Sequence, residues 1–311
     1  MRTIHRHLLA PKPPHYVWDN SLPPHLTITS DETVTFETRD AADGHFRLES
    51  TSADVATYEF HGHPLTGPVY VEGARPGDVL QVDVLEVQPA TFGWTAVLPG
   101  FGLLPEDFAQ PYLRTWDLRD GVTARLGERF RIPLAPFCGV MGVAVAEPGE
   151  HPTIPPRRTG GNVDIKQLVA GSALYLPIEV DGALFSVGDA HAAQGDGEVC
   201  VSAIEMCSTT TLRFRIRRDL AIQEPQFMTP GSPTRGSSGA AYATTAHSSD
   251  LMQATKQAIR YMLDHLVRSY SLSREDAYCL CSVAVDLKIS EVVDAPNWIV
   301  SAFLPLEIVA G

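Results

Sequence analysis

One stretch near the middle of the chain gathers residue types that can bind a metal ion or transfer a proton. Residues 187–205 read VGDAHAAQGDGEVCVSAIE. Asp189 and His191 are two positions apart, so on a strand their side chains would point to the same face. Glu198 follows a turn framed by glycines. An aspartate, a histidine and a further carboxylate offer the ligands that zinc takes. An exposed acidic hairpin with a stray histidine is the other interpretation of this spacing.

The charge around this stretch favours a cation. Between Lys166 and Arg213 the sequence contains no lysine or arginine. Six carboxylates lie in the same interval, namely Glu179, Asp181, Asp189, Asp196, Glu198 and Glu205. Carboxylates that are buried without positive partners either take a raised pKa or bind a cation. The segment therefore predicts a site for a divalent metal ion.

A second candidate lies upstream, in PPRRTGGNVDIKQL at 155–168. The paired glycines 160 and 161 allow a left-handed turn or a close approach of the backbone. Asn162 and Asp164, again two positions apart, would point the same way on an extended segment. Asp164 could then join the metal site. A solvated turn that leads into a short helix explains the same residues equally well.

A third candidate is the pair His61 and His63, which alternate along an extended segment that a proline-marked turn closes. Histidines at this spacing can bind a metal together, although surface or hydrogen-bonded histidines are the more common explanation. A thiol nucleophile is a further possibility, because Cys200 lies near Glu198 and His191. No basic residue or helix start lowers the pKa of that thiol, so we expect Cys200 to be an inward-facing strand residue.

The elements that must position these residues are mainly strands. Alternation of apolar and polar residues over TTTLRFRIRRD (209–219) is typical of a half-buried strand. Further strands are predicted at 25–30, 33–40, 78–87, 139–146 and 199–206. Asp181-Gly182 has the composition of a type I′ turn. It therefore predicts a hairpin between the segments 173–180 and 183–191.

Two helices and two loops complete the expected elements. Apolar residues recur at three- and four-residue spacing over 249–269, behind a cap formed by residues 248–250. A shorter helix is expected from Ser273, where a capping box begins. Segments 99–111 and 225–239 are rich in proline, glycine and serine, and either could be a lid. Cys279 and Cys281 are expected on one face of a strand as small core residues.

Composition narrows the class of protein. Of the 311 residues, 44% are hydrophobic and 20% are charged, which is typical of a folded globular chain. The 24 basic and 37 acidic side chains give a net charge of −13, which argues against nucleic-acid and anionic-membrane partners. Five cysteines without a C-x-x-C pair argue against a disulfide framework or a zinc ribbon. No apolar run is long enough for a membrane span or a secretion signal, so we expect a cytoplasmic protein.

These motifs together resemble a known family. The stretches HPLTGPVYVEGARPGDVLQVDVLEV (63–87), GGNVDIKQLVAGSALYLPIEVDGALFSVGDAHAAQGDGEV (160–199) and AIE (203–205) are similar to the acetamidase/formamidase family. GVMGVA (139–144) and AYCLCSVAVDLKISEVVDAP (277–296) fit its remaining blocks. The blocks occur in the family's order from about residue 25 to 305, so the resemblance covers nearly the whole chain.

The resemblance implies a fold and an activity. The fold would be α+β and mainly β, with a β-sandwich or barrel-like core, a few helices and one long helix in the C-terminal half. We expect one domain over 1–311, with β-rich subdomains at about 1–150 and 151–311 as the alternative organisation. The implied activity is metal-dependent hydrolysis of formamide, acetamide or similar small amides with release of ammonia. A homo-oligomer, dimeric or higher, and a bound Zn²⁺ are also implied.

Ligand chemistry at the matching positions assigns the metal site. Asp189 and His191 are the first expected ligands, and Asp164 and His63 would complete the shell. A zinc ion polarises a carbonyl and lowers the pKa of bound water towards about 7.

The remaining roles fall to three further residues. Glu198 is the expected general base. Asn162 and Gln194 have both donors and acceptors, so they could bind the amide or the developing oxyanion. A small substrate favours a tight pocket. The alternatives are hydrolysis of a larger or cyclic amide, such as a lactam, and a non-catalytic binding protein that holds a metal.

Overall fold

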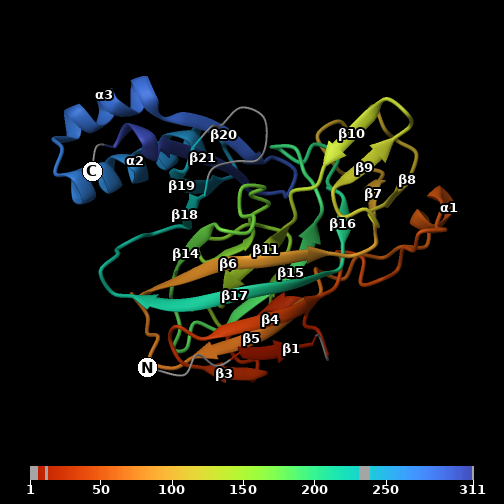
Figure 1. Cartoon of the computed structure of the whole chain (residues 1–311), viewed down its shortest axis with the longest axis horizontal. Helices are drawn as coiled ribbons and strands as arrows, with labels where there is room; N and C mark the ends of the chain where they lie inside the picture. The colour runs from red at the N-terminus through yellow and green to blue at the C-terminus, as the bar shows by residue number, and fades with distance from the viewer. Residues whose placement is uncertain (1–5, 11–12, 231–238, 310–311) are drawn as a thin grey trace.

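The computed structural model describes residues 6–10, 13–230 and 239–309. Two large sheets dominate the fold (Figure 1). The nine-stranded sheet runs, in spatial order, β1 (Arg6–Leu9), β4 (Thr33–Thr38), β17 (Ser208–Arg217), β6 (Val79–Pro89), β14 (Ala173–Pro177), β18 (Gln226–Thr229), β19 (Ala241–Ser248), β21 (Trp298–Pro305) and β20 (Asp286–Glu291). Its neighbours are antiparallel except for β1 and β4.

The eight-stranded sheet carries three of the predicted site residues, Asn162 on β13 (Gly160–Asn162) and Asp189 and His191 on β15 (Phe185–His191). Its main path is β13, β11 (Phe137–Val143), β15, β16 (Glu205–Met206), β7 (Phe92–Val97) and β8 (Tyr112–Asp117). Strand β5 (Leu65–Val71) pairs with β15, and β3 (Leu26–Ile28) pairs with β5. Two small sheets are β9 (Thr123–Leu126) with β10 (Phe130–Pro133), and β2 (Val17–Trp18) with β12 (His151–Pro152).

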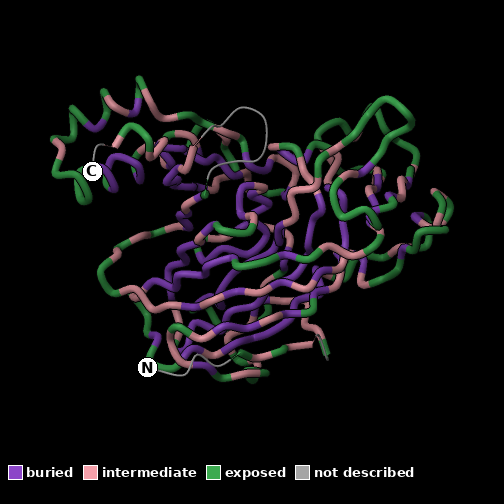
Figure 2. Tube along the Cα trace, viewed as in Figure 1, coloured by how far each residue is buried: buried purple, intermediate pink, exposed green. Residues whose placement is uncertain are grey.

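The core lies between the two large sheets, where buried residues form a continuous band in the middle of the molecule (Figure 2). Phe36 of β4 and Phe214 of β17 pack edge to face with Phe185 of β15, with ring centroids 6.0 and 5.0 Å apart. Such aromatic pairs join the inner faces of the two sheets. The predicted mainly β, sandwich-like α+β fold is therefore confirmed, and no closed barrel forms within the described residues.

The helices lie mostly at one end of the molecule (Figure 1). α2 (Leu251–Tyr270) packs its apolar side on β19 and β21. The Asp250 carboxylate caps it by accepting a hydrogen bond from the Gln253 amide at 2.8 Å, and this confirms the long helix predicted over 249–269. Ser273 caps α3 (Arg274–Ala284). α1 (Ser52–Val55) and the 3₁₀ helix η1 (Leu306–Ile308) are short.

The strand predicted for Cys279 and Cys281 is wrong, because both residues lie on α3. The cap at Ser273 starts a helix that continues through the apolar run and ends only before β20. Cys281 is buried and Cys279 is exposed. No helix in the described part of the chain is both long and apolar enough to cross a membrane.

The hairpin predicted at Asp181-Gly182 is also wrong. β14 pairs with β6 and β18 in one large sheet, whereas β15 pairs with β11, β16 and β5 in the other. The turn therefore carries the chain between sheets. Gly182 has a φ of +75°, and a Cβ there would lie 2.1 Å from the Tyr70 ring. Gly182 is therefore needed for close packing against Tyr70. The sequence Asp181-Gly182 is compatible with this role as well as with a hairpin turn.

Other sequence predictions can be compared element by element. Strands expected at 25–30, 33–40, 78–87, 139–146 and 209–219 are present as β3, β4, β6, β11 and β17. The strand expected at 199–206 is wrong except for its last two residues, β16, because the chain turns repeatedly after Glu198. Segment 99–111 consists of turns, bends and irregular backbone, as expected for a loop. β18 lies within 225–239, and residues 231–238 are outside the described residues. The single-domain organisation stays a prediction.

Candidate active site

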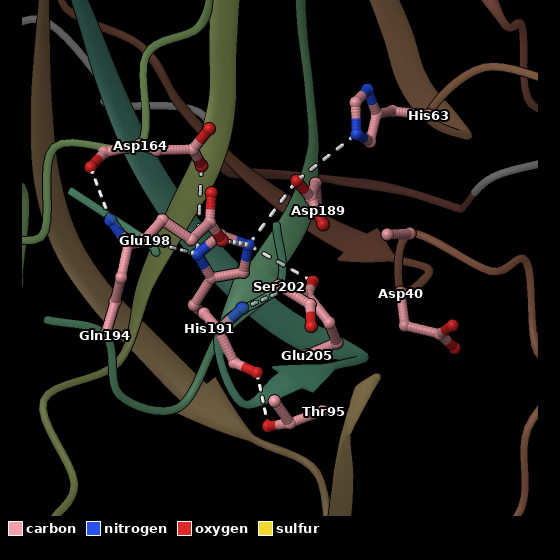
Figure 3. Close-up of polar contacts among 12 residues, drawn as sticks. Asp40, His63, Thr95, Asp164, Asp189, His191, Gln194, Glu198, Ser202 and Glu205 are labelled. Atoms are coloured by element: carbon pink, nitrogen blue, oxygen red, sulfur yellow. Dashed lines mark hydrogen bonds and ion pairs between the residues drawn. The ribbon is translucent and has the colours of Figure 1, made fainter. Parts of the chain in front are cut away.

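A cavity of about 560 Å³ opens beside the end of β15. Five carboxylates line it, those of Asp164, Asp189, Glu198, Glu205 and Asp294, together with Asn162 and His63. No lysine or arginine is among the described residues that line it. Figure 3 shows most of these side chains gathered around His191. The acidic stretch predicted from the sequence is therefore part of a buried site, and the exposed-hairpin interpretation is wrong.

His191 is at the centre of this cluster and is fully oriented by its neighbours. The Gln194 side chain donates from Nε2 to the Asp164 backbone carbonyl at 2.7 Å, which fixes its Oε1 towards His191 Nδ1 at 2.8 Å. Nδ1 must therefore donate, and Nε2 faces the opposite way. His191 Nε2 lies 3.1 Å from Glu205 Oε2 and 3.4 Å from Asp189 Oδ2. The predicted pairing of Asp189 and His191 on one face of a strand is confirmed.

Strand register explains why Glu205 reaches this site. Glu205 of β16 stands directly opposite His191 of β15. His191 Nε2, Glu205 Oε2 and Asp189 Oδ1 are buried, and none has a hydrogen-bond partner within the described structure. Buried polar atoms are normally hydrogen-bonded, so atoms without a hydrogen bond on three neighbouring side chains indicate a place for a ligand. Asp189, His191 and Glu205 form one group whose donor atoms lie within 4.8 Å of one another.

A second group of possible metal ligands shares His191 with the first (Figure 3). It consists of Asp164, His191 and Glu198. The Asp164 and Val163 amides both donate to the carbonyl of Gly139 on β11, which places Asp164 Oδ1 3.8 Å from His191 Nδ1. Glu198 Oε1 lies 4.0 Å from His191 Nε2. Neither carboxylate oxygen of Asp164 has a hydrogen-bond partner among the residues that the structure describes.

Asn162 and Asp294 extend the polar wall. Asn162, on β13, is buried and donates from Nδ2 to Asp294 Oδ2 at 2.7 Å. Its Oδ1 has no hydrogen-bond partner in the described part of the chain. The solvated-turn interpretation of this segment is therefore wrong. Asp294 lies in the loop between β20 and β21, and Glu291 Oε1 accepts hydrogen bonds from the amides of Val293 and Asp294 in that loop.

The predicted His63 also reaches the site, whereas His61 is exposed. His63 is buried, with Nδ1 3.0 Å from Thr153 Oγ1 and Nε2 3.7 Å from Asp189 Oδ2. Gln194 is placed differently from the prediction, because its amide is occupied by His191 and Asp164 and it does not line the cavity. It positions His191 without contact to the cavity.

The electrostatics show an excess of buried negative charge. Burial raises the pKa of Glu205 to about 8, with a further contribution from Asp189 that His191 opposes. Burial also raises the pKa of Glu198 well above its ordinary value, and Asp164 adds to this. For His191, burial would lower the pKa, but Glu205 and Asp189 raise it well above its ordinary value. The cluster lacks the positive charge that a divalent cation would supply.

Three of the site carboxylates belong to residues with a left-handed backbone conformation. Asp164, Asp189 and Glu198 have φ angles of +41°, +51° and +46°. A residue other than glycine held in this left-handed region costs on the order of 1 kcal/mol or more, and such residues gather at functional sites. The fold thus holds three of the site carboxylates in strained conformations.

Two acidic residues of the site had little signal in the sequence. Asp294 and Glu291 come about 90 residues after the acidic stretch, and only the block SEVVDAP that carries the family resemblance could have indicated them. Conversely, Asp196 belongs to the acidic stretch but does not line the cavity. It forms an ion pair with Lys166 at 2.9 Å.

No cysteine is among the described residues that line the cavity. Cys200 does not line the cavity, and its Sγ lies 3.3 Å from the Ser202 carbonyl. Burial raises the pKa of Cys138 to about 11.

Comparison with known proteins agrees with the fold. The model of the Acetamidase/Formamidase family matches residues 5–151 and 144–310, so the chain belongs to this family. A formamidase of Methylophilus methylotrophus is 26% identical over 94% of this chain and 89% of its own. An acetamidase of Mycolicibacterium smegmatis is 30% identical over 62% of this chain and 63% of its own. The crystal structure of an acetamidase from Bacillus halodurans superposes with a TM-score of 0.87, at 32% identity, covering 96% of this chain and 97% of that one.

Proposed function

We propose that this protein hydrolyses carboxylic amides to a carboxylate and ammonia, and that the activity depends on a divalent metal ion, Zn²⁺, in the cavity beside β15. Relatives named formamidase and acetamidase along most of the chain support the reaction. The observation that supports the metal is a close group of side chains: His191 Nε2 lies 3.1 Å from Glu205 Oε2 and 3.4 Å from Asp189 Oδ2. Within the described residues, His191 Nε2, Glu205 Oε2 and Asp189 Oδ1 have no hydrogen-bond partner.

The donor set fits zinc. One imidazole nitrogen and two carboxylates are a ligand set that leaves a coordination position open. We assign Asp189, His191 and Glu205 as the residues that would hold the ion, with His63 beside Asp189 and Asp164 facing His191 from the other side. When bound, the ion would polarise the substrate carbonyl and make water a stronger nucleophile at neutral pH. Gln194 would hold the His191 ring in the orientation that metal binding requires.

Two side chains would act on the substrate directly. Glu198 lines the cavity, and we assign it as the general base that takes a proton from water and passes it to the departing nitrogen. Burial raises its pKa well above the ordinary value, which favours the uptake of a proton by this carboxylate. No described residue donates a hydrogen bond to Asn162 Oδ1, so this atom can accept one from the amide nitrogen of the substrate.

The assembly and location of the protein are part of the same proposal. We propose a homo-oligomer, dimeric or higher, in the cytoplasm, with no nucleic-acid or membrane partner. The family resemblance supports the oligomer, and the net charge of −13 supports the absence of anionic partners. Light scattering on the purified protein would measure the oligomer directly.

Ammonia release tests the function. The purified enzyme is assayed with acetamide, then again after chelation and after re-addition of Zn²⁺. We expect chelation to abolish ammonia release and zinc to restore it. A protein that retains zinc but releases no ammonia from any amide would be a metal-holding binding protein. Opening of a lactam without ammonia release from linear amides would favour the cyclic substrate.

A further inference from the structure

The cavity is much larger than a small amide requires. Acetamide has four non-hydrogen atoms and needs on the order of 100 Å³, taking about 30 Å³ for each water-sized group. The cavity measures about 560 Å³, within the range of roughly 300–1,000 Å³ that is typical of sites for larger organic ligands. The tight pocket expected from the sequence is therefore absent.

The cavity has two chemically different ends. The carboxylates, Asn162 and His63 form the acidic end described above. The rest of the wall is mostly apolar and comes from several separate segments, including Tyr58, Phe60, Trp94, Leu98, Phe101 and Ile154. A site of this kind places a polar reacting group at one end and an apolar substituent at the other.

The polar atoms of the apolar wall are already engaged elsewhere. Trp94 donates from Nε1 to Asp40 Oδ1 at 3.2 Å, and the Tyr58 hydroxyl donates to the Ala41 carbonyl at 3.2 Å. The Ser202 hydroxyl donates to the Ala96 carbonyl at 2.8 Å. These residues therefore leave mainly carbon surface for a ligand, which a fragment as small as a methyl group could cover only in part.

Segment 98–103 forms one side of this wall and is held in place. The Leu103 amide donates to the Val199 carbonyl at 2.8 Å, next to Glu198, and the Phe101 amide donates to the Leu98 carbonyl at 3.1 Å. The Phe101 side chain is 57% exposed, although it lines the cavity. An apolar group of the substrate would cover part of this exposed ring.

The acidic end of the cavity indicates where on the amide the apolar substituent is attached. Its described side chains are mainly hydrogen-bond acceptors, including the carboxylates and Asn162 Oδ1. An unsubstituted amide nitrogen carries two donors that match such acceptors, whereas a bulky group on nitrogen would displace them. The apolar group therefore belongs on the acyl carbon.

We propose that the substrate is a primary amide whose acyl group carries an aryl or branched alkyl substituent of about the size of a benzyl group. This proposal rests on the amidase function proposed above. The reaction is the same, R–CO–NH₂ plus water giving a carboxylate and an ammonium ion, with R seated against Phe101, Trp94 and Ile154.

A substrate series with the metal-loaded enzyme tests the proposal. Ammonia release is measured for formamide, acetamide, isobutyramide and phenylacetamide. Each methylene-sized group that becomes buried should raise kcat/KM by about fourfold, so phenylacetamide should exceed acetamide by about 100-fold or more. A kcat/KM for acetamide equal to or above that for phenylacetamide would overturn the size inference and leave the amidase function intact. No ammonia from any amide would overturn both.

Two variants test the wall itself. Phe101→Ala and Phe108→Ala remove the same side chain from one segment, and both rings are more than half exposed, at 57% and 54%. Only Phe101 lines the cavity. We expect Phe101→Ala to lower the ratio of kcat/KM for phenylacetamide to that for acetamide by about tenfold, while Phe108→Ala leaves the ratio unchanged. An equal effect of the two variants would contradict the assigned wall.

Discussion

Gly139 is the position where the smallest substitution should do the most damage to the site. It lies on β11, and its carbonyl accepts hydrogen bonds from the amides of Val163 and Asp164 at 3.0 and 3.2 Å. A Cβ built on Gly139 would lie 2.3 Å from Asp164 Oδ1 and 2.7 Å from His191 Cε1. The absent side chain is thus what allows Asp164 and His191 to approach each other.

The magnitude follows from these distances. Because Cβ contacts shorter than 3.0 Å essentially do not occur, Asp164 Oδ1 must move by at least 0.7 Å, the difference between 3.0 and 2.3 Å. Functional groups must be held within about 0.5 Å of their working positions. A displacement of about 1 Å can lower the rate by about 100-fold. Gly139→Ala should therefore lower kcat/KM by about that factor, with a loss of stability of about 1–3 kcal/mol from overpacking.

The assay combines ammonia release, metal content and thermal unfolding for Gly139→Ala and a matched control. Gly195→Ala is the control, since a Cβ at Gly195 meets nothing within 4 Å and its φ is not in the left-handed region. We expect the control to match the parent. A folded Gly139→Ala variant that carries full metal and keeps activity within about threefold of the parent would refute this prediction.

The remaining predictions concern a base, a thiol and a buried histidine. Glu198→Gln should keep the metal content and KM near the parent values but lower kcat by about 10²–10⁴, as loss of a general base does; loss of the metal would instead make Glu198 a ligand. Cys200→Ala should keep turnover within about tenfold, and a loss of several orders of magnitude with an intact fold would indicate a thiol nucleophile. Burial lowers the pKa of His265 to about 4, so the unfolded state binds more protons between pH 6.5 and 4. Stability should therefore fall by up to about 3 kcal/mol as the pH decreases through that range. His265→Phe, which can still stack on Tyr242, should reduce this fall in denaturant titrations, and an unchanged pH dependence would contradict the assignment.

Local signals in the sequence were sufficient for several elements. The Asp250 cap and the apolar spacing behind it are enough to specify α2, because both depend on residues within one helix. The alternation of apolar residues with Arg213 and Arg215 likewise specifies β17. Asp189 and His191 could be paired from their spacing because they lie on one strand.

Features set by contacts distant in sequence were not predictable in this way. Asp181-Gly182 permits a hairpin, but the pairing partners of β14 and β15 decide that the chain changes sheets there. Glu205 reaches His191 through strand register, although the strand predicted around it is mostly absent. Asp294 reaches Asn162 only because the loop between β20 and β21 folds over the site. The importance of Gly139 comes from two residues distant in sequence, His191 on β15 and Asp164, whose side chains lie where its Cβ would be.

The position of the metal tests the central claim most directly. Diffraction data from crystals of the zinc-loaded enzyme, collected on both sides of the zinc absorption edge, would locate the ion. We predict an anomalous difference peak about 2.0–2.2 Å from His191 Nε2 and from a carboxylate oxygen of both Asp189 and Glu205, and its loss in Asp189→Asn. Crystals of an active enzyme with zinc bound elsewhere, or with no peak at these residues, would contradict the account.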